Sequence, residues 1–483
     1  MWLDGLYMGQ PFYTEYAVTF HQDTVLNDVA NQFVWMENHA RDAKTGLLYH
    51  GWDESKEQKW ADKKTGLSPH FWGRAMGWYG MALVDVLESF PKNHPRQKEL
   101  VAILKRFAEA VKKVQDPKTG LWWDILDKPN YKNNYPEASA SCMLVYTYAK
   151  AVRNGWLPAT YLPVAKKGYD GIIKTFTETD KNGQFNLNGT VSVSGLGGNP
   201  DSYRDGSFEY YMSEKVIQND PKGVGAFIQC AAEMQMIPDL ALGKGKTILL
   251  DHFFNSEPKK DITGTPIDYH YVWDEMDNNG FSIFGHVFQK YGVDTATLYQ
   301  APIAAALSKA GMYLIVDPDN AKENPSPNYM TEAYAKTIYD WVNKGGVLVL
   351  MTNDSANCDL KHFNILSDKF GIHFNDQGRN FVKGNDYPTG TVTIPSGNAI
   401  FKNTQQVYIK EISTLGLSKT ATAAVSADKD VVIATAKVGK GTVFAIGDPW
   451  LYNEYTDGRK IPAELQNYSA ANDLVKWLIS KSK

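Results

Sequence analysis

One carboxylate near the start of the chain stands among residues that could tune its chemistry. Asp4 lies two residues after Trp2 and four residues before Met8. In the first turn of a helix these side chains would share one mouth, with Met8 one turn above Asp4. Apolar surroundings disfavour the charged form of a carboxyl group, so Asp4 could donate a proton and take it back. The alternative is that Asp4 only caps a helix, as aspartate often does.

Two later motifs carry further groups of the same kind. Residues 49–53 read Y-H-G-W-D after a turn, and residues 72–78 read W-G-R-A-M-G-W at the start of a long helix. Taken alone, His50 is more often structural, and Arg74 is more often part of an ion pair. A guanidinium group can nevertheless hold a carboxylate through two parallel hydrogen bonds, which Lys cannot do.

With the W-x-D-G-L-Y-M run of residues 2–8, these motifs resemble the unsaturated glucuronyl and rhamnogalacturonyl hydrolases of glycoside hydrolase family 105 and its relative family 88. The three motifs match in order and separation, and the resemblance covers residues 1–240. It implies an all-α (α/α)6 barrel of helical hairpins. It also implies removal of a terminal 4,5-unsaturated uronic acid from oligosaccharides that lyases release, as from pectin or arabinogalactan.

The resemblance assigns a role to each matched residue. Asp4 would be the general acid and base that protonates C4 and activates water for attack at C5, after which the hemiketal opens. The two-carboxylate spacing rule of ordinary glycosidases then does not apply. Arg74 would hold the uronate carboxylate, and His50 would contact the sugar or the water. The remaining substrate contacts would be Trp2, Met8 and Trp72. No cofactor is implied, and no His or carboxylate pair has the spacing of metal ligands.

Helical periodicity dominates residues 1–243, which we predict to form the barrel domain. The pattern D-x-K-T-G-L occurs three times, beginning at Asp42, Asp62 and Asp116, which indicates a repeated helical hairpin. About seven long helices are expected before residue 240, whereas a closed six-hairpin barrel needs twelve. We therefore expect a barrel that is incomplete at its N-terminus and lacks a partner carboxylate.

Residues 244–483 show alternating strands and helices, typical of an α/β domain with a mostly parallel sheet. Strand order and the turn at residues 447–450 resemble glutamine-amidotransferase-like accessory domains. Amidotransferase chemistry needs a Cys directly after a central strand. Cys358 comes several residues too late after the strand that ends at Met351. The sequence therefore favours an accessory domain without catalysis.

Composition excludes several other classes of protein. Charged residues make up 22% and the formal net charge is −4, so nucleic acid is not an expected partner. No apolar run is long enough for a membrane span. The three Cys are too far apart for a metal or disulfide motif. No signal peptide is recognised, so a periplasmic and a cytoplasmic location both stay open.

Two other functions are compatible with the sequence. One is a carbohydrate-binding or scaffold protein that kept the aromatic mouth without turnover. The other is a different barrel enzyme acting on sugars, such as an epimerase or a conventional glycosidase. Hydration removes the ultraviolet absorbance of the conjugated double bond, whereas neither alternative function does. A measurement of this absorbance therefore distinguishes the predicted hydrolase from both.

Overall fold

The computed structural model describes residues 1–483 and divides the chain into two compact units. The helical unit is Met1–Ile237 and the α/β unit is Pro238–Lys483. The boundary falls six residues before the predicted position at residue 243, within the short helix η3 (Ile237–Asp239) that directly follows the last long helix.

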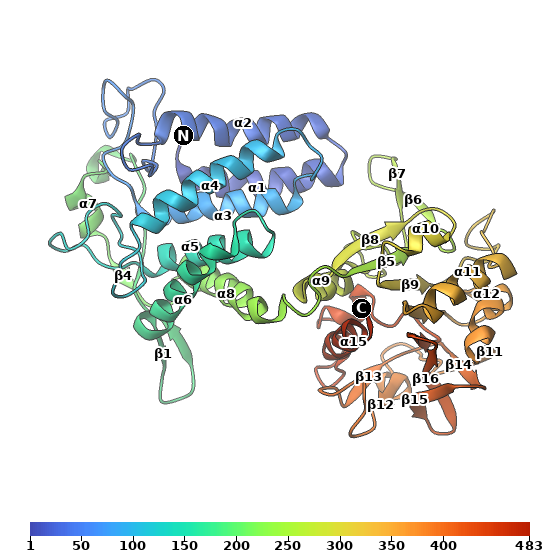
Figure 1. The fold of residues 1–483 in the computed structure, drawn as a ribbon. Helices are drawn as coiled ribbons and strands as arrows, with labels where there is room; N and C mark the ends of the chain where they lie inside the picture. The colour runs from blue at the N-terminus through green and yellow to red at the C-terminus, as the bar shows by residue number, and fades with distance from the viewer. The chain divides into compact units, whose positions relative to one another are not determined.

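Seven long helices make up the helical unit (Figure 1). Four of them pack successively side by side, in the order α1, α3, α5 and α8, and α2, α4 and α6 pack against them as a second layer. The predicted helical hairpins are confirmed, and the incompleteness of the barrel at its N-terminus stays a prediction. The long helices are α1 (Leu3–Thr19), α2 (Asp23–Ala40), α3 (Gly73–Ser89), α4 (Gln97–Lys113), α5 (Ala138–Arg153), α6 (Leu162–Phe176) and α8 (Pro221–Met236).

Small elements connect these helices. The helical spacing expected through residues 11–40 is divided between α1 and α2, which are separated at His21, whose φ of 54° is left-handed. The small elements are η1 (Ala159–Tyr161), η2 (Pro200–Ser202), α7 (Phe208–Ser213), β1 (Thr177–Thr179), β2 (Phe185–Leu187), β3 (Thr190–Val191) and β4 (Val216–Ile217).

Helices α3 and α5 are buried almost all round, as is typical of helices in a core. On α3, only Asp85, Glu88 and Ser89 are not buried. Gly77 lets α3 approach α5 closely, since a Cβ there would lie 2.7 Å from the Met143 Cβ. The outer helix α4 instead buries one apolar face and exposes Lys and Glu side chains on the other.

The three D-x-K-T-G-L copies form the same closed turn. In each, the Asp carboxylate accepts hydrogen bonds from the backbone N–H and the hydroxyl of Thr, as Asp116 does from Thr119. The Gly N–H donates to the Asp carbonyl, and the Asp N–H donates to the Leu carbonyl. Gly46, Gly66 and Gly120 have φ between 76° and 80°, which glycine adopts at little cost.

Substitution of the third turn glycine tests this packing. We expect Gly120→Ala to destabilise the helical unit by more than the roughly 1–2 kcal/mol of a left-handed L-residue, because its Cβ would lie 2.4 Å from the Lys167 carbonyl oxygen. Gly155→Ala is the matched control, with φ of 74° and no atom within 4 Å of its Cβ. Urea unfolding measures both variants, and equal losses would contradict the packing role.

The α/β unit is built on a nine-stranded sheet, with the path order β11-β14-β16-β17-β10-β9-β5-β8 and with β15 paired to β16. The parallel part contains β5 (Thr247–Asp251), β8 (Asp294–Leu298), β9 (Met312–Val316), β10 (Val347–Met351) and β17 (Gly441–Ile446). The antiparallel part contains β11 (Ile372–Arg379), β14 (Ile412–Leu417), β15 (Ala421–Ala427) and β16 (Asp430–Val438).

The prediction of a mostly parallel sheet is therefore wrong, since the sheet is mixed. Strands β15, β16 and β17 follow one another through tight turns at residues 428–429 and 439–440, and such short connections permit only antiparallel pairing. Strand β16 also pairs antiparallel with β14 and with β15, so the antiparallel part extends beyond β17.

Helices cover both faces of this sheet, in agreement with the prediction. One apolar core contains residues of α9 (Ser282–Lys290) and α15 (Asn467–Lys481), and the other contains residues of α11 (Glu332–Asn343) and α12 (Leu360–Ser367). The remaining elements are α10 (Ala304–Leu307), α13 (Tyr387–Gly390), α14 (Asn453–Thr456), η4 (Asp368–Phe370), β6 (Pro258–Lys260), β7 (Pro266–Asp268), β12 (Thr391–Thr393) and β13 (Gln406–Tyr408).

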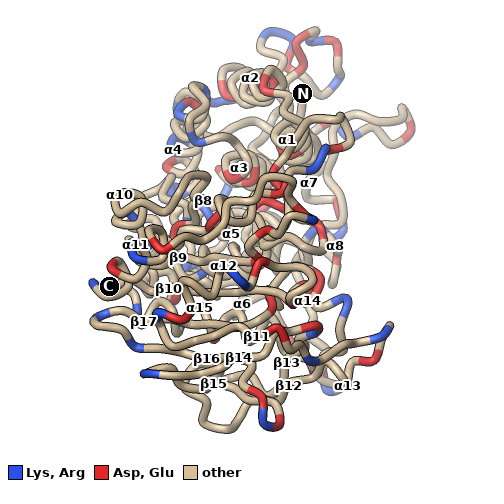
Figure 2. Tube along the Cα trace, turned by 90° about the vertical axis from the view of Figure 1, so that its right-hand side faces the viewer, with Lys and Arg blue, Asp and Glu red and all other residues tan.

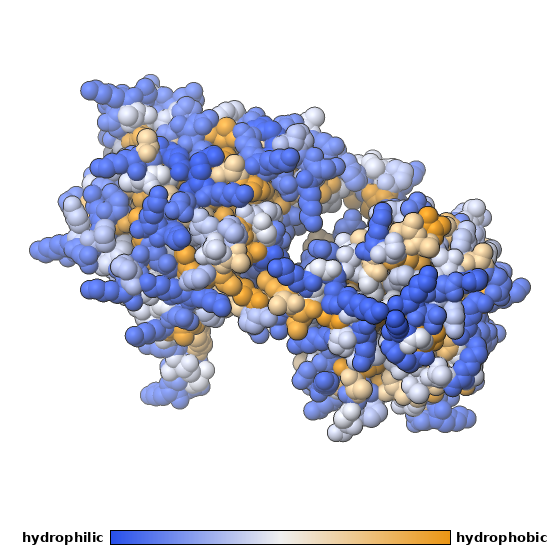
Figure 3. All heavy atoms as spheres, viewed as in Figure 1, coloured by the Kyte–Doolittle hydropathy of each residue, from blue (hydrophilic) through white to orange (hydrophobic).

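The surface of the protein is mixed in character. Lys and Arg are interspersed with Asp and Glu along the chain (Figure 2). The face shown in Figure 3 is largely hydrophilic, with apolar residues in separate patches. None of the helices combines the length and apolar composition required to cross a membrane.

Candidate active site

Backbone contacts bring the three sequence motifs to one end of the helical unit. Trp2 forms an antiparallel bridge with Gly51, and the Leu3 N–H donates to the His50 carbonyl oxygen at 3.0 Å. Trp72 forms a bridge with Ile125 in the same manner. The segments that precede α1, α3 and α5 are therefore linked, and the N-terminal ends of these helices meet. Helix N-termini carry partial positive charge, which favours an anionic ligand at this end.

Asp4 and His50 form the centre of the site. Asp4 lies in the first turn of α1, as predicted, and its Oδ2 is 3.1 Å from His50 Nε2. The Asp4 side chain is 19% exposed, whereas that of His50 is fully buried. Their contact lacks the alignment of a hydrogen bond, which leaves both polar atoms without a hydrogen-bond partner. A substrate hydroxyl or a water molecule could therefore bond to either group.

Tyr211 orients His50 from behind. Its hydroxyl lies 2.7 Å from His50 Nδ1. Burial, with a smaller contribution from Asp124, raises the pKa of the Tyr211 phenol well above its usual range, so the group keeps its proton. A Tyr211 hydroxyl that donates to Nδ1 leaves the imidazole proton on Nε2, facing Asp4.

Aromatic rings surround His50. The centroid of Trp2 lies 5.7 Å from that of His50, and the centroid of Trp72 lies 4.8 Å from it. Trp2 is partly exposed and Trp72 is buried. The structure therefore brings together Asp4, Trp2, His50 and Trp72. Met8 lies on the same helix as Asp4 but is 62% exposed, so it forms an open edge rather than a closed wall.

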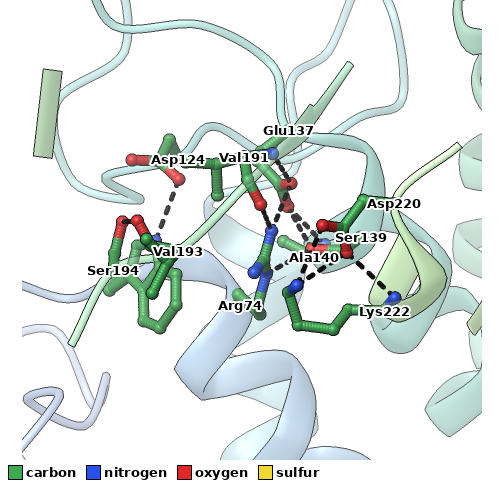
Figure 4. A network of polar contacts seen from close by, with 11 residues as sticks. Arg74, Asp124, Glu137, Ser139, Ala140, Val191, Val193, Ser194, Asp220 and Lys222 are labelled. Atoms are coloured by element: carbon green, nitrogen blue, oxygen red, sulfur yellow. Dashed lines mark hydrogen bonds and ion pairs between the residues drawn. The ribbon is translucent and has the colours of Figure 1, made fainter. Parts of the chain in front are cut away.

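Arg74 lies behind Trp72 in a buried polar network (Figure 4). Its Nε donates to Ser139 Oγ at 2.7 Å, and its Nη2 donates to Glu137 Oε1 at 3.4 Å and to the Val191 carbonyl oxygen. The guanidinium carbon is 5.4 Å from the Trp72 ring centroid. Arg74 Nη1 makes none of these bonds. The Glu137 carboxylate thus already bonds to part of the Arg74 guanidinium group, which we expected to hold the uronate of the substrate.

Glu137 is the N-cap of α5 and is fully satisfied. Its carboxylate accepts hydrogen bonds from the Ala140 N–H and the Ser139 hydroxyl, each at 2.7 Å, and from the Val191 N–H at 2.9 Å. Together with Arg74 these donors use both oxygens of the carboxylate, so Glu137 has a structural role in this arrangement.

Asp124 is a buried carboxyl group that the site predictions omitted. Its Oδ1 accepts a hydrogen bond from Trp72 Nε1 at 2.9 Å, and its Oδ2 has no partner. A sequence signal for it existed, because Asp124 follows Gly120 by four residues. His50 and His70 follow Gly46 and Gly66 by the same interval. Each copy of the repeated turn is therefore followed, four residues after its glycine, by a polar side chain. Tyr211, far away in sequence, had no such signal.

The family comparison agrees with this geometry. The model of Glycosyl Hydrolase Family 88 matches residues 1–237. Protein Atu3128 of Agrobacterium fabrum (strain C58 / ATCC 33970) is 37% identical over 241 residues, which are 48% of this chain and 99% of that protein.

Two further similarities are more partial. The unsaturated rhamnogalacturonyl hydrolase YesR of Bacillus subtilis (strain 168) is 31% identical over 140 residues, which are 29% of this chain and 38% of that protein. A solved structure described as a family 105 glycoside hydrolase of C. acetobutylicum ATCC 824 is 48% identical, with a TM-score of 0.48. That match covers 49% of this chain and 65% of the other.

The helical unit and its mouth are thus those of a glycoside hydrolase, and the prediction that the protein is an enzyme is confirmed. More narrowly, the chain belongs to glycosyl hydrolase family 88. It spans 38% of the Bacillus subtilis hydrolase and 65% of the family 105 structure, so reaction and substrate are matters for proposal.

The titration of Asp124 provides a test of this site. Burial, followed by the charge of Glu137, raises the pKa of Asp124 to about 8, although the Trp72 bond and Arg74 act in the opposite direction. In the unfolded chain the group titrates near about 4. Between these values the folded state holds a proton that the unfolded state has lost, so the free energy of unfolding falls as pH rises and levels off above about pH 8.

We expect Asp124→Asn to flatten this fall, by up to about 5 kcal/mol between pH 4 and pH 8, while keeping an acceptor for Trp72. Urea unfolding of the helical unit at several pH values measures the slope. The exposed Asp201→Asn is the control and should leave the slope unchanged. The same slope in both variants would show that Asp124 ionises normally.

Proposed function

We propose that the protein removes a terminal 4,5-unsaturated uronic acid from lyase-generated oligosaccharides by hydration of the C4=C5 double bond. The observation that carries the proposal is the Asp4 carboxyl group, which is partly exposed to solvent and lies 3.1 Å from a buried, oriented His50. Membership of family 88 supports it, as does the similarity to a hydrolase named for unsaturated rhamnogalacturonyl substrates.

In this proposal Asp4 acts twice. As an acid it donates a proton to C4 of the unsaturated ring, and as a base it removes a proton from the water that attacks C5. The hemiketal that results opens and releases the remaining sugar. His50 Nε2–H stabilises the Asp4 carboxylate between the two steps, and Trp2 and Trp72 flank the unsaturated ring.

The substrate carboxylate would meet positive charge from two sources. The N-termini of α1, α3 and α5 converge at this end, and Arg74 lies immediately behind Trp72. We propose that Arg74 Nη1 bonds to the uronate, while Nε and Nη2 anchor the group to Ser139 and Glu137. A neutral sugar in the same position would lose this interaction.

Substitution of Asp4 tests the chemical step. Asp4→Asn should lower the turnover rate by about 10²–10⁴, because a proton-transfer group is lost while the shape of the side chain is kept. Ultraviolet absorbance of the conjugated double bond follows turnover of an unsaturated uronyl disaccharide. Asp23→Asn, an exposed carboxylate in the first turn of α2, is the control and should keep full activity. Normal turnover by Asp4→Asn would remove Asp4 from the mechanism.

Substitution of Arg74 tests carboxylate recognition. Arg74→Lys should raise KM about tenfold for the uronate substrate, since the Lys ammonium is a single nitrogen and lacks the planar fork whose separate nitrogens would reach Ser139, Glu137 and the uronate. For the methyl ester of the same disaccharide, KM should change little. The ratio between the two substrates separates recognition from a general loss of structure. An equal rise for both would assign Arg74 a purely structural role.

A further inference from the structure

The parallel part of the sheet in the α/β unit contains a topological switch point. In chain order these strands are β5, β8, β9, β10 and β17, whereas in space they lie in the order β8-β5-β9-β10-β17. From β5 the chain continues to β8 on one side, and from β9 it continues to β10 on the other. The chain therefore leaves β5 and β9 toward opposite sides of this point. Open α/β sheets bind ligands in the crevice at such a point, outside the C-terminal ends of the strands.

Buried polar atoms without partners gather at this point. Asn255 lies in the loop after β5, Asp317 and Asp319 lie in the loop after β9, and Thr352 directly follows β10. All four residues are at least nine-tenths buried. Both amide atoms of Asn255, one carboxylate oxygen of each Asp and the Thr352 hydroxyl have no hydrogen-bond partner. A buried polar group without a partner is costly, and a bound ligand that supplies partners would remove the cost.

Backbone bonds show that these groups are neighbours. The Asp317 N–H donates to the Met351 carbonyl oxygen at 2.8 Å, which holds Asp317 beside the residue that precedes Thr352. The Asp319 N–H donates to the Phe254 carbonyl oxygen at 2.8 Å, which joins the two loops next to Asn255. The unpartnered atoms therefore belong to one place on the sheet edge.

Carboxyl groups gather at this site. Half-buried Glu257 and Glu323 lie beside the two aspartates. Burial, followed by the charges of Glu323 and other carboxylates, raises the pKa of Asp317 well above its usual range. Burial together with Glu257 and Asp319 raises the pKa of Glu323 to about 7. These shifts favour protonated, neutral carboxyl groups, which can donate as well as accept hydrogen bonds.

Catalysis by a thiol is disfavoured at the same site. Burial, with Asp317 as the next cause, raises the pKa of the Cys358 thiol well above its usual range. A protonated, buried thiol is a poor nucleophile. The expectation of an accessory domain without amidotransferase chemistry thus gains support, and binding is the role that the site can perform.

We propose that the α/β unit binds a neutral polyhydroxylated ligand, a hexose unit of a carbohydrate, at the switch point between β5 and β9. Sugar hydroxyls would donate to the unpartnered oxygens of Asp317 and Asp319, and the Asn255 amide and the Thr352 hydroxyl would supply donors and acceptors in return. A sugar fits because it offers many hydrogen bonds and no negative charge. No three His, Cys, Asp or Glu side chains here are arranged to hold a metal ion.

Thr352→Val tests the proposal because the two side chains have the same shape. In the absence of ligand this substitution should raise Tm by a few degrees, since a buried hydroxyl without a partner is removed. Thr456→Val is the matched control in the same unit. Thr456 is also buried, but its hydroxyl donates to the Tyr452 carbonyl oxygen at 3.1 Å, so its loss should lower Tm. A fall in Tm for Thr352→Val would show that its hydroxyl has a structural partner and would overturn the proposal.

Binding itself is measured by isothermal titration calorimetry on the full chain with D-galactose, D-glucose and L-rhamnose. We expect saturable binding of at least one of them, weakened about tenfold or more by Thr352→Val and unchanged by Trp2→Ala, which alters only the mouth of the helical unit. The proposal is overturned by an absence of saturable binding for all three sugars, by equal affinity in Thr352→Val, or by binding of only magnesium chloride or putrescine. Turnover at Asp4 is assayed separately, so either proposal can fail alone.

Discussion

The active-site end of the helical unit depends on one buried ion pair, that of Arg74 and Glu137. Burial of two charges is costly unless each charge is paired and its remaining hydrogen-bonding capacity is used. Glu137 meets this condition with bonds from Arg74, Ser139, Ala140 and Val191. The pair therefore links the start of α3, the start of α5 and strand β3 into one rigid support. Trp72, whose ring lies against the guanidinium group, is held by the same arrangement.

That support explains how residues far apart in sequence form one site. Trp72 is fixed by Arg74 on one side and by Asp124 on the other, and it packs against His50. His50 is fixed in turn by Tyr211, which lies 161 residues later in the chain. Asp4 is the member of this series that solvent reaches. The rigid groups are thus buried and Asp4, the group that we propose to transfer the proton, is accessible to solvent.

The α/β unit is stabilised by two apolar cores of its own. Its parallel strands are buried on both faces, so their polar chemistry is confined to the strand ends. There the switch between β5 and β9 collects side chains that the fold leaves without partners. A catalytic unit for anionic sugar ends and a second unit for neutral sugars would together recognise an oligosaccharide with both kinds of residue.

Sequence alone determined the features that depend on local spacing. Helical periodicity located the long helices, and the repeated D-x-K-T-G-L pattern predicted three turns whose glycines indeed have positive φ. The motifs around Asp4, His50 and Trp72 identified the family, because their residue types and order are specific. The seven long helices before residue 240 were also countable, since amphipathic stripes are a local property.

Only the tertiary structure decided which groups meet. The pairing of Arg74 with Glu137, the bond from Tyr211 to His50 and the burial of Asp124 join segments that no spacing rule connects. The exposure of Met8 and the antiparallel half of the sheet were decided in the same way. The physical reason is that desolvation and hydrogen-bond satisfaction depend on neighbours in space. The sequence names the groups that need partners, and the fold determines which partners they find.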